Sequence, residues 1–373
     1  MKILYIGHYK EGGGWSRTAI DHILALDRSG FDVVCQNVKL TNTQPEVPNR
    51  ILELEKKDPS NCDVCIQHVL PHHLVGSSSF KKNIAYVELE TVSIRDTSWF
   101  NYLQLVDEIW VPNKDIQDGL LDDEVGVPVH VVHHTHNIDI YTRPYETIDL
   151  KPIKDDFKFY FIGDLNDRKN IESIVRCFHA EFKPYEPASL ILKVGKFGRS
   201  PQEVHSLTDQ IILRAKQSLR LYPDISEYKK DVVISNKVPE EKIYALHQSC
   251  DCFVSPSHGE AWSIPSFDAM AFGNTPICSN FGGPKEFINP LNVKTGALVN
   301  GVRMICNSQD SAFPHLFTGR EYWFTPSEME IRKYMRHYYE KRDKVASKQA
   351  GITRARQFTY QSFGQRVSDL LNE

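Results

Sequence analysis

The 373-residue chain lacks a strong excess of either charge, because 44 Lys and Arg face 48 Asp and Glu for a formal charge of −4. A nucleic-acid-binding protein normally carries a basic excess or a basic face, so we expect no nucleic-acid partner. No apolar run approaches the roughly 20 residues that cross a bilayer, and the apolar stretch at residues 3–6 is too short for the core of a signal peptide. We therefore expect a cytoplasmic protein.

Cysteine is also sparse. Eight cysteines in a chain of this length, most of them in apolar stretches, predict buried reduced thiols and no disulfide scaffold. Cys62 and Cys65 form a Cys-x-x-Cys pair, but no second pair follows at zinc spacing. Two histidine groups lack the nearby acids and the spacing that fix a metal-ligand set, so we expect no metal site; they are His68, His72 and His73, and His130, His133, His134 and His136.

The sequence predicts two α/β domains. A strand at residues 2–6, a glycine-rich loop, a helix and a strand that begins with residues 31–35 open the chain as a β-α-β unit, which implies a parallel sheet. The polar, proline-containing stretch 141–152 predicts a linker. A second strand, loop and helix then follow over 157–182. Two Rossmann-like domains that face one another across an interdomain cleft are the expected architecture, and further strands are predicted at 64–67, 83–87, 108–111, 129–133, 190–194, 232–235, 251–255 and 276–279.

The stretch from Ser255 to Asn274 carries the strongest chemical pattern. A strand ends at Ser255, a loop carries Glu260, and Pro265 opens a short helix whose free N–H groups attract phosphate. We place Asp268 in the first turn of that helix. Two carboxylates repel phosphate, so we interpret them as acceptors for hydroxyl groups on either side of a diphosphate. The alternatives are a solvated loop acid and an acid that stabilises a helix terminus.

This stretch resembles the signature of family 4 retaining glycosyltransferases, which have the GT-B fold of two Rossmann-like domains. The resemblance consists of Glu260, seven residues, Asp268, then Ala-Met-Ala-x-Gly-x-x-Pro to Pro276, and Gly282-Gly283-Pro284-Lys285-Glu286. It implies that Glu260 contacts the donor sugar and Asp268 the ribose. It also implies that the backbone of Ala261, Trp262, Ser263 and Ile264 binds sugar and diphosphate. Asp268 replaces the usual Glu, and Ala-Trp-Ser-Ile replaces a glycine-rich loop.

Three further segments resemble sites of that family. In the loop from Gly163 to Asn170, Lys169 matches the lysine that neutralises the departing diphosphate, and Arg168 is the nearest substitute for an arginine whose place is taken by Asp164. Gly13 and Gly14 resemble the N-domain loop close to donor phosphate or acceptor; the P-loop alternative fails because Gly13 stands where its lysine must be. Glu90 stands near a strand end that contacts sugar or acceptor. His134 or His136 is expected to line the cleft. The alternatives are a solvated basic turn for the loop with Lys169, a plain turn for the two glycines, and a solvated acid at a strand end for Glu90.

The resemblance implies a retaining glycosyltransferase of the hexosyltransferase type. It would move a sugar from a nucleotide-diphosphate donor to a hydroxyl of a glycan, lipid-linked or other acceptor, without a metal or other cofactor. Residues 1–148 would form the acceptor-side domain, 149–355 the donor domain, and 356–373 a last helix that crosses back to the first domain. Two alternatives stay open: a catalytically silent nucleotide-sugar-binding protein, which Asp164 permits, and a nucleotide-sugar epimerase of the same fold.

The stretch 327–356 carries nine Lys and Arg against four Asp and Glu. Such a stretch is typical of a solvated helix face. A peripheral contact with a membrane surface, or with an acidic acceptor, is the other interpretation.

Overall fold

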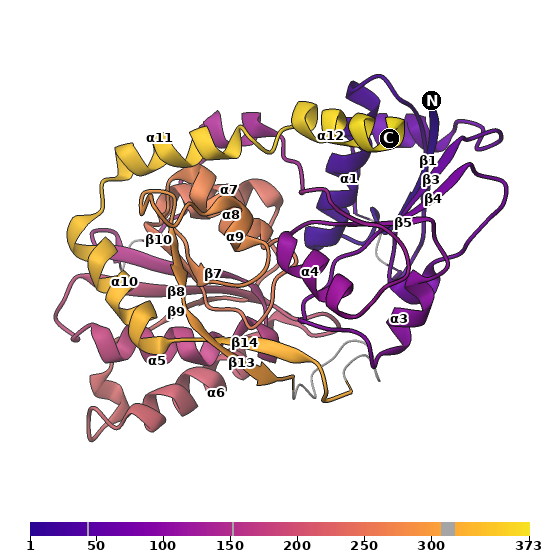
Figure 1. Ribbon diagram of the computed structural model, residues 1–373. Coiled ribbons are helices and arrows are strands. Elements are labelled where there is room, and N and C mark those ends of the chain that lie inside the picture. The colour runs from indigo at the N-terminus through magenta and orange to yellow at the C-terminus, as the bar shows by residue number, and fades with distance from the viewer. Residues whose placement is uncertain (43–44, 151–152, 307–317) are drawn as a thin grey trace. The chain divides into compact units, whose positions relative to one another are not determined.

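The computed structural model describes residues 1–42, 45–150, 153–306 and 318–373. They form two compact units (Figure 1). Unit 1 contains residues 1–138, with 318–322 and 356–373; unit 2 contains the described residues between 139 and 306, with 323–355. The first segment of unit 1 therefore ends at Ile138, ten residues before the domain boundary expected at residue 148.

Unit 1 is built on a parallel sheet. Among the described residues its strands follow the order β2-β1-β3-β4-β5-β6, so the order reverses between β1 and β3. Each strand coincides with a short apolar run, as expected for strands that are buried on both faces. The strands are β1 (Lys2–Gly7), β2 (Asp32–Asn37), β3 (Val64–His68), β4 (Lys82–Tyr86), β5 (Glu108–Val111) and β6 (Val129–Val131).

The last helix of the chain, α12 (Tyr360–Asn372), packs on the first helix, α1 (Gly13–Arg28), in unit 1 (Figure 1). Its apolar face places Phe363 and Val367 in the core beside Ile23 of α1. A Cβ atom on Gly364 would lie 1.7 Å from Ser29 Oγ, so the absence of a side chain lets the helices approach closely. The other helices of unit 1 are α2 (Asn49–Glu55), α3 (Ser98–Leu103) and α4 (Lys114–Asp122).

Unit 2 repeats the architecture. Among the described residues its main sheet has the order β12-β11-β10-β7-β8-β9, and a separate two-stranded sheet contains β13 and β14. The strands are β7 (Phe157–Asp164), β8 (Ala188–Gly195), β9 (Val232–Ile234), β10 (Cys252–Ser255), β11 (Ile277–Ser279), β12 (Ala297–Val299), β13 (Gly301–Ile305) and β14 (Tyr322–Pro326). The helices are α5 (Ile171–Glu181), α6 (Pro201–Leu219), α7 (Glu240–Ser249), α8 (Ile264–Phe272), α9 (Pro284–Phe287), α10 (Glu328–Lys341) and α11 (Lys344–Ala355).

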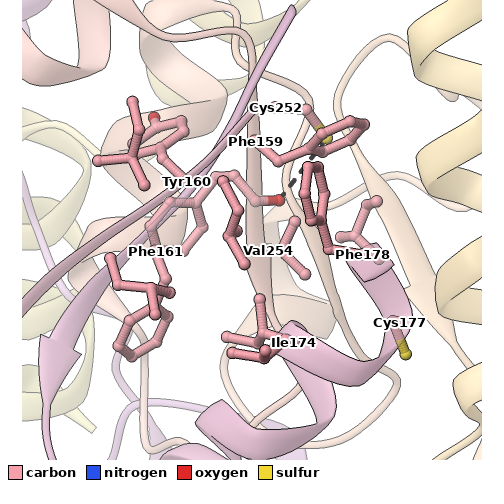
Figure 2. Close-up of a cluster of buried hydrophobic side chains, with 14 of the residues drawn as sticks. Phe159, Tyr160, Phe161, Ile174, Cys177, Phe178, Cys252 and Val254 are labelled. Atoms are coloured by element: carbon pink, nitrogen blue, oxygen red, sulfur yellow. Dashed lines mark hydrogen bonds between the residues drawn. The ribbon is translucent and has the colours of Figure 1, made fainter. Parts of the chain in front are cut away.

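Aromatic side chains dominate the core of unit 2. Phe159 of β7 and Phe178 of α5 lie with their ring centres 6.0 Å apart, and Val254 of β10 belongs to the same cluster (Figure 2). Phe161 is fully buried as well. Four consecutive residues of β7, 158–161, are buried, so both faces of the strand are covered, which fits its almost continuously apolar sequence.

The basic stretch near the C-terminus is not simply a solvated helix face. Arg336 of α10 pairs with Glu181 at 2.8 Å and with Glu186 at 2.6 Å. Arg342 forms an ion pair with Asp251 at 2.5 Å. The opposite side of α10 is buried through Ile331, Met335 and Tyr338. These arginines therefore neutralise acids within unit 2, an arrangement that a count of charges along the chain does not reveal.

All eight cysteines are free and buried, which confirms the prediction of reduced thiols. Burial raises the pKa of the Cys65 thiol to about 12, so it is protonated at neutral pH. In the part of the chain that the structure describes, no helix is long and apolar enough to cross a membrane.

Candidate functional site

The site residues of unit 2 gather at the carboxyl ends of β7 and β10. These strands pair in parallel, with Cys252 opposite Phe159, so the loops that follow them emerge at the same edge of the sheet. The loop after β7 carries Arg168 and Lys169, and the loop after β10 carries Glu260. Sheet topology thus brings together side chains that are separated by 91 residues in sequence.

Glu260 is the centre of a buried ion triad. Its Oε1 accepts a hydrogen bond from Lys169 Nζ at 2.7 Å, and its Oε2 lies 3.2 Å from Arg168 Nη1. The Glu260 side chain is only 8% exposed. Burial is the largest single influence and raises its pKa, but Lys169 and Arg168 together outweigh burial and lower the pKa from 4.5 to about 2. The carboxylate is therefore ionised throughout the physiological pH range.

A single helical turn, η4 (Asp167–Lys169), presents the two basic side chains. Asn166 caps this turn by accepting the backbone N–H of Lys169, and Asn170 ends it with a positive φ of 51°. The side chain of Asn170 then donates to the Pro256 carbonyl at 3.1 Å, while Arg168 Nη1 donates to the Gly259 carbonyl at 2.6 Å. The two loops are consequently tied to each other by the backbone as well as by charge.

The start of α8 lies directly after Glu260. Ser263 precedes the helix with a positive φ of 72°, and no side chain caps the helix start. Ala261, Trp262, Ser263 and Ile264 are all buried. Pro265 has no N–H, and the N–H groups of Ser266 and Phe267 donate to the Ser263 carbonyl, so this helix start offers an anion the N–H of Ile264 and the positive end of the helix dipole.

Gly282 and Gly283 pack against the backbone of the loop that carries Glu260. Gly283 donates its N–H to the Glu260 carbonyl at 3.0 Å. A Cβ atom on Gly283 would lie 2.2 Å from Trp262 Cα, and one on Gly282 would lie 2.2 Å from the Glu260 carbonyl oxygen. Only glycine fits at this close approach of two backbones, which gives the Gly-Gly pair of the sequence pattern a physical reason.

Asp268 is not in the first turn of α8, so that prediction is wrong. The helix begins at Ile264, ahead of the expected Pro265, and no acid lies in its first turn. Asp268 is 2% exposed and accepts a hydrogen bond from Tyr141 Oη at 2.7 Å. Nothing in the sequence indicated that Tyr141 contacts Asp268, because Tyr141 lies in the stretch interpreted as a linker. The role of Asp268 toward a ribose stays a prediction.

Gly163 and Asp164 are strand residues, whereas the sequence analysis assigned them to the following loop. β7 continues to Asp164 because β8 pairs with it over its whole length, with Gly163 opposite Val194 and Asp164 opposite Gly195. Asp164 is exposed at this edge and raises the pKa of nearby Lys193, although burial, the larger influence, lowers it.

In unit 1, Gly13 opens α1 with a positive φ of 79°, and both Gly13 and Gly14 are exposed. The helix start that they form has neither a side-chain cap nor an acid in its first turn. Its N–H groups are therefore compatible with an anion, as the resemblance implies.

Glu88, which the sequence analysis did not select, lies in a buried polar network of unit 1. Its Oε1 lies 3.1 Å from both His68 Nε2 and His134 Nε2. Burial raises the pKa of Glu88, but His134 and His68 together lower it to about 2. Glu90 lies two residues further along and is half-buried. Both acids lie just after β4, which ends at Tyr86, so the sequence pattern could not distinguish them.

The histidines that were expected to line a cleft are core residues of unit 1. His134 is 3% and His136 2% exposed, and burial lowers the pKa of both. Tyr5 Oη bridges His22 Nδ1 at 3.2 Å and His68 Nδ1 at 2.9 Å. In the described part of the chain, no three His, Cys, Asp or Glu side chains are arranged to hold a metal ion.

Comparisons with known proteins give a family match for part of the chain and a fold for the whole chain. Residues 146–305 match the family described as Glycosyl transferases group 1, and this segment contains Lys169, Arg168 and Glu260. No curated protein matches the sequence of the chain.

Solved structures resemble the whole chain at low sequence identity. HepE of Anabaena, solved with UDP-glucose, has a TM-score of 0.66 and 15% identity over 100% of this chain and 99% of its own. Sucrose-phosphate synthase of Thermosynechococcus elongatus has a TM-score of 0.66 and 14% identity over 100% and 98%. An alpha,alpha-trehalose-phosphate synthase (UDP-forming) of Burkholderia xenovorans, in complex with glucose-6-phosphate, has a TM-score of 0.64 and 8% identity over 100% of both chains. The chain thus has the GT-B fold of two Rossmann-like units, and its unit 2 carries the segment that matches glycosyl transferases group 1.

Proposed function

We propose that this chain is a retaining glycosyltransferase that moves a sugar from a nucleotide-diphosphate donor to an acceptor hydroxyl. The observation that carries the proposal is the buried triad of Glu260, Lys169 and Arg168 beside the uncapped start of α8. The family match of residues 146–305 supports it. UDP-glucose, the ligand named for HepE, is the first donor to test.

In the proposed reaction the donor diphosphate binds at the start of α8. Lys169 and Arg168 neutralise the charge that develops on the diphosphate as the bond between the anomeric carbon and the phosphate oxygen breaks. Stabilisation of developing charge by one preorganised donor contributes about 2.7–4 kcal/mol in studied enzymes. Glu260, which stays ionised, accepts hydrogen bonds from hydroxyls of the donor sugar, and Asp268 accepts one from the ribose.

The acceptor oxygen forms the new bond on the face from which the diphosphate departs, and the diphosphate takes the acceptor proton. The anomeric configuration is thereby retained without a covalent enzyme intermediate. The acceptor is a hydroxyl of a glycan or a lipid-linked molecule. Because Lys169, Arg168 and backbone N–H groups supply the positive charge, we propose that the reaction needs no metal ion, so turnover should persist in excess EDTA.

A thermal-shift screen with UDP, GDP, ADP and their glucose and mannose conjugates tests donor binding. A ligand at 100 times its dissociation constant stabilises a protein by about 2.7 kcal/mol, which such a screen detects readily. Donors that bind are then incubated with a mixture of mono- and oligosaccharide acceptors, and the anomeric configuration of the product is read by NMR. An inverted product would exclude retention, and no shift with any nucleotide would exclude the donor class.

Two controls separate the alternatives. A donor that is converted in the absence of acceptor would identify an epimerase. Lys169→Ala should lower turnover about 100- to 1,000-fold while donor affinity changes far less, whereas a silent binder has no turnover to lose. Lys242→Ala is the matched control, because Lys242, on α7, pairs with the exposed Glu146 and has no part in the triad.

A further inference from the structure

The two-stranded sheet β13–β14 contacts the Glu260 loop, although β14 lies beyond the segment that matches the family. Phe324 of β14 donates its N–H to the His258 carbonyl at 2.9 Å, and the Phe324 carbonyl accepts a hydrogen bond from His258 Nδ1, also at 2.9 Å. The neighbouring Trp323 stacks on the His258 ring, with ring centres 5.5 Å apart and planes 10° apart. Phe324 also stacks on Phe281, with ring centres 5.9 Å apart.

His258 itself connects both loops of the site. It lies two residues before Glu260, and its own N–H donates to the Arg168 carbonyl at 2.8 Å. Arg168 in turn donates from its side chain to the Gly259 carbonyl. A displacement of His258 would therefore move the backbone on which Arg168 and Glu260 both depend.

We propose that His258 is a positioning residue, through which β14 fixes the loop that carries Glu260. This inference rests on the proposed function, because the loop is the one that would face the donor sugar. Three contacts with residues outside the triad hold His258. Two are hydrogen bonds to the backbone of Phe324, and the third is the stack of its ring on Trp323. The ion triad then forms between side chains whose backbones are already fixed.

The protonation state of His258 suits this role. Burial, the largest influence, lowers its pKa, so the ring is neutral at pH 7. The bond to the Phe324 carbonyl requires the proton on Nδ1. Asp167 and Arg168 are the charged groups that act on the ring, and their influences oppose one another.

Two substitutions separate the hydrogen bond from the ring. His258→Phe retains a ring that can stack on Trp323 but lacks the Nδ1 donor. His258→Asn lacks the ring but places an amide N–H₂ at the same number of bonds from Cα as Nδ1, so it can still donate to the Phe324 carbonyl. His247→Phe is the matched control for loss of stability. Its ring stacks on Phe272 at 5.5 Å and 13°, and its Nδ1 bonds Tyr160 Oη, in the core of the same unit.

The experiment measures kcat, KM and hydrogen exchange of peptides from residues 255–262. We expect His258→Phe to lower kcat about 10- to 100-fold, as small misplacements of catalytic groups do, and to speed exchange of the loop. His258→Asn should keep most of the parent's kcat and most of the parent's protection of the loop against exchange. His247→Phe should lower the melting temperature and leave kcat and loop exchange unchanged.

The inference is overturned if His258→Phe keeps kcat within about twofold of the parent and leaves loop exchange unchanged, or if His258→Asn is impaired as much as His258→Phe. If the parent protein neither binds a donor nor turns one over, the proposed function fails. Loop exchange then still decides whether β14 holds the loop through His258, because that measurement needs no activity.

Discussion

Replacing Glu260 by Gln should expose the energetic coupling within the triad. A pKa of about 2 in place of 4.5 corresponds to about 3 kcal/mol in favour of the folded protein at neutral pH. Because the folded-state pKa is lowered, this stabilisation is complete above about pH 4.5 and is lost as the pH falls toward 2. Gln in this place leaves Lys169 and Arg168, which are 13% and 15% exposed, without their shared counter-charge.

The loss should depend on Lys169. Removing one member of a buried ion pair leaves an uncompensated charge and costs about 3–5 kcal/mol, whereas removing both members costs less. We therefore expect Glu260→Gln and Lys169→Met each to destabilise by about 3 kcal/mol and the double variant by clearly less than their sum. The resulting coupling energy should be about 2 kcal/mol.

Urea unfolding followed by circular dichroism measures the free energy of unfolding for the parent, the two single variants and the double variant. The control cycle uses Lys242→Met and Glu146→Gln, an exposed pair whose coupling should stay below about 1 kcal/mol. Additivity of the two triad substitutions within about 0.5 kcal/mol would refute the argument, because Glu260 would then owe its ionised state to something other than Lys169.

Three further predictions concern other parts of the chain. Gly283→Ala should abolish the thermal shift by the donor nucleotide, because its Cβ would lie 2.2 Å from Trp262 Cα. Gly195→Ala is the control and should keep the shift, because its Cβ would make only an ordinary contact at 3.9 Å. Phe363→Ala should destabilise the protein by about 3–5 kcal/mol by opening a cavity between α12 and α1, and exposed Gln365→Ala should not; equal melting temperatures would contradict the packing. Below pH 6.5 the protein should lose stability, because burial lowers the pKa of His8 to about 4 and its Nε2 accepts the Leu70 N–H only when the ring is neutral. His8 alone accounts for up to about 3 kcal/mol of this loss by pH 4, and urea unfolding that is independent of pH between 7 and 4 would contradict it.

Most of the two main sheets could be predicted from the sequence. The runs at β1, β5, β7 and β10 are apolar and short, and the glycine loops and helical stripes between them indicate parallel β-α-β units. The two-stranded sheet of β13 and β14 was missed, because its residues are mixed in polarity and largely exposed on β13. The contact of β14 with His258 depends on tertiary packing, which the hydrophobic periodicity of the sequence does not predict.

The site could be predicted in part. Glu260 was indicated by its place in a loop after an apolar strand, and Lys169 and Arg168 by the resemblance of their loop to a glycosyltransferase site; the structure brings all three together. Asp268 was placed in the wrong turn, and its partner Tyr141 was hidden in the stretch interpreted as a linker. Glu88 could not be distinguished from Glu90, since only its contacts with His68 and His134 identify it.

The sequence by itself determined the alternation of strands and helices, and with it the edge of each sheet at which loop side chains must gather. The physical reason is local: hydrophobic periodicity and glycine positions act over a few residues. Only the tertiary structure decided that Glu260 is ionised, that the arginines of α10 neutralise acids, and that β14 holds His258. Each of these depends on burial and on partners far away in the sequence, because desolvation and ion pairing are properties of the folded environment rather than of the residue.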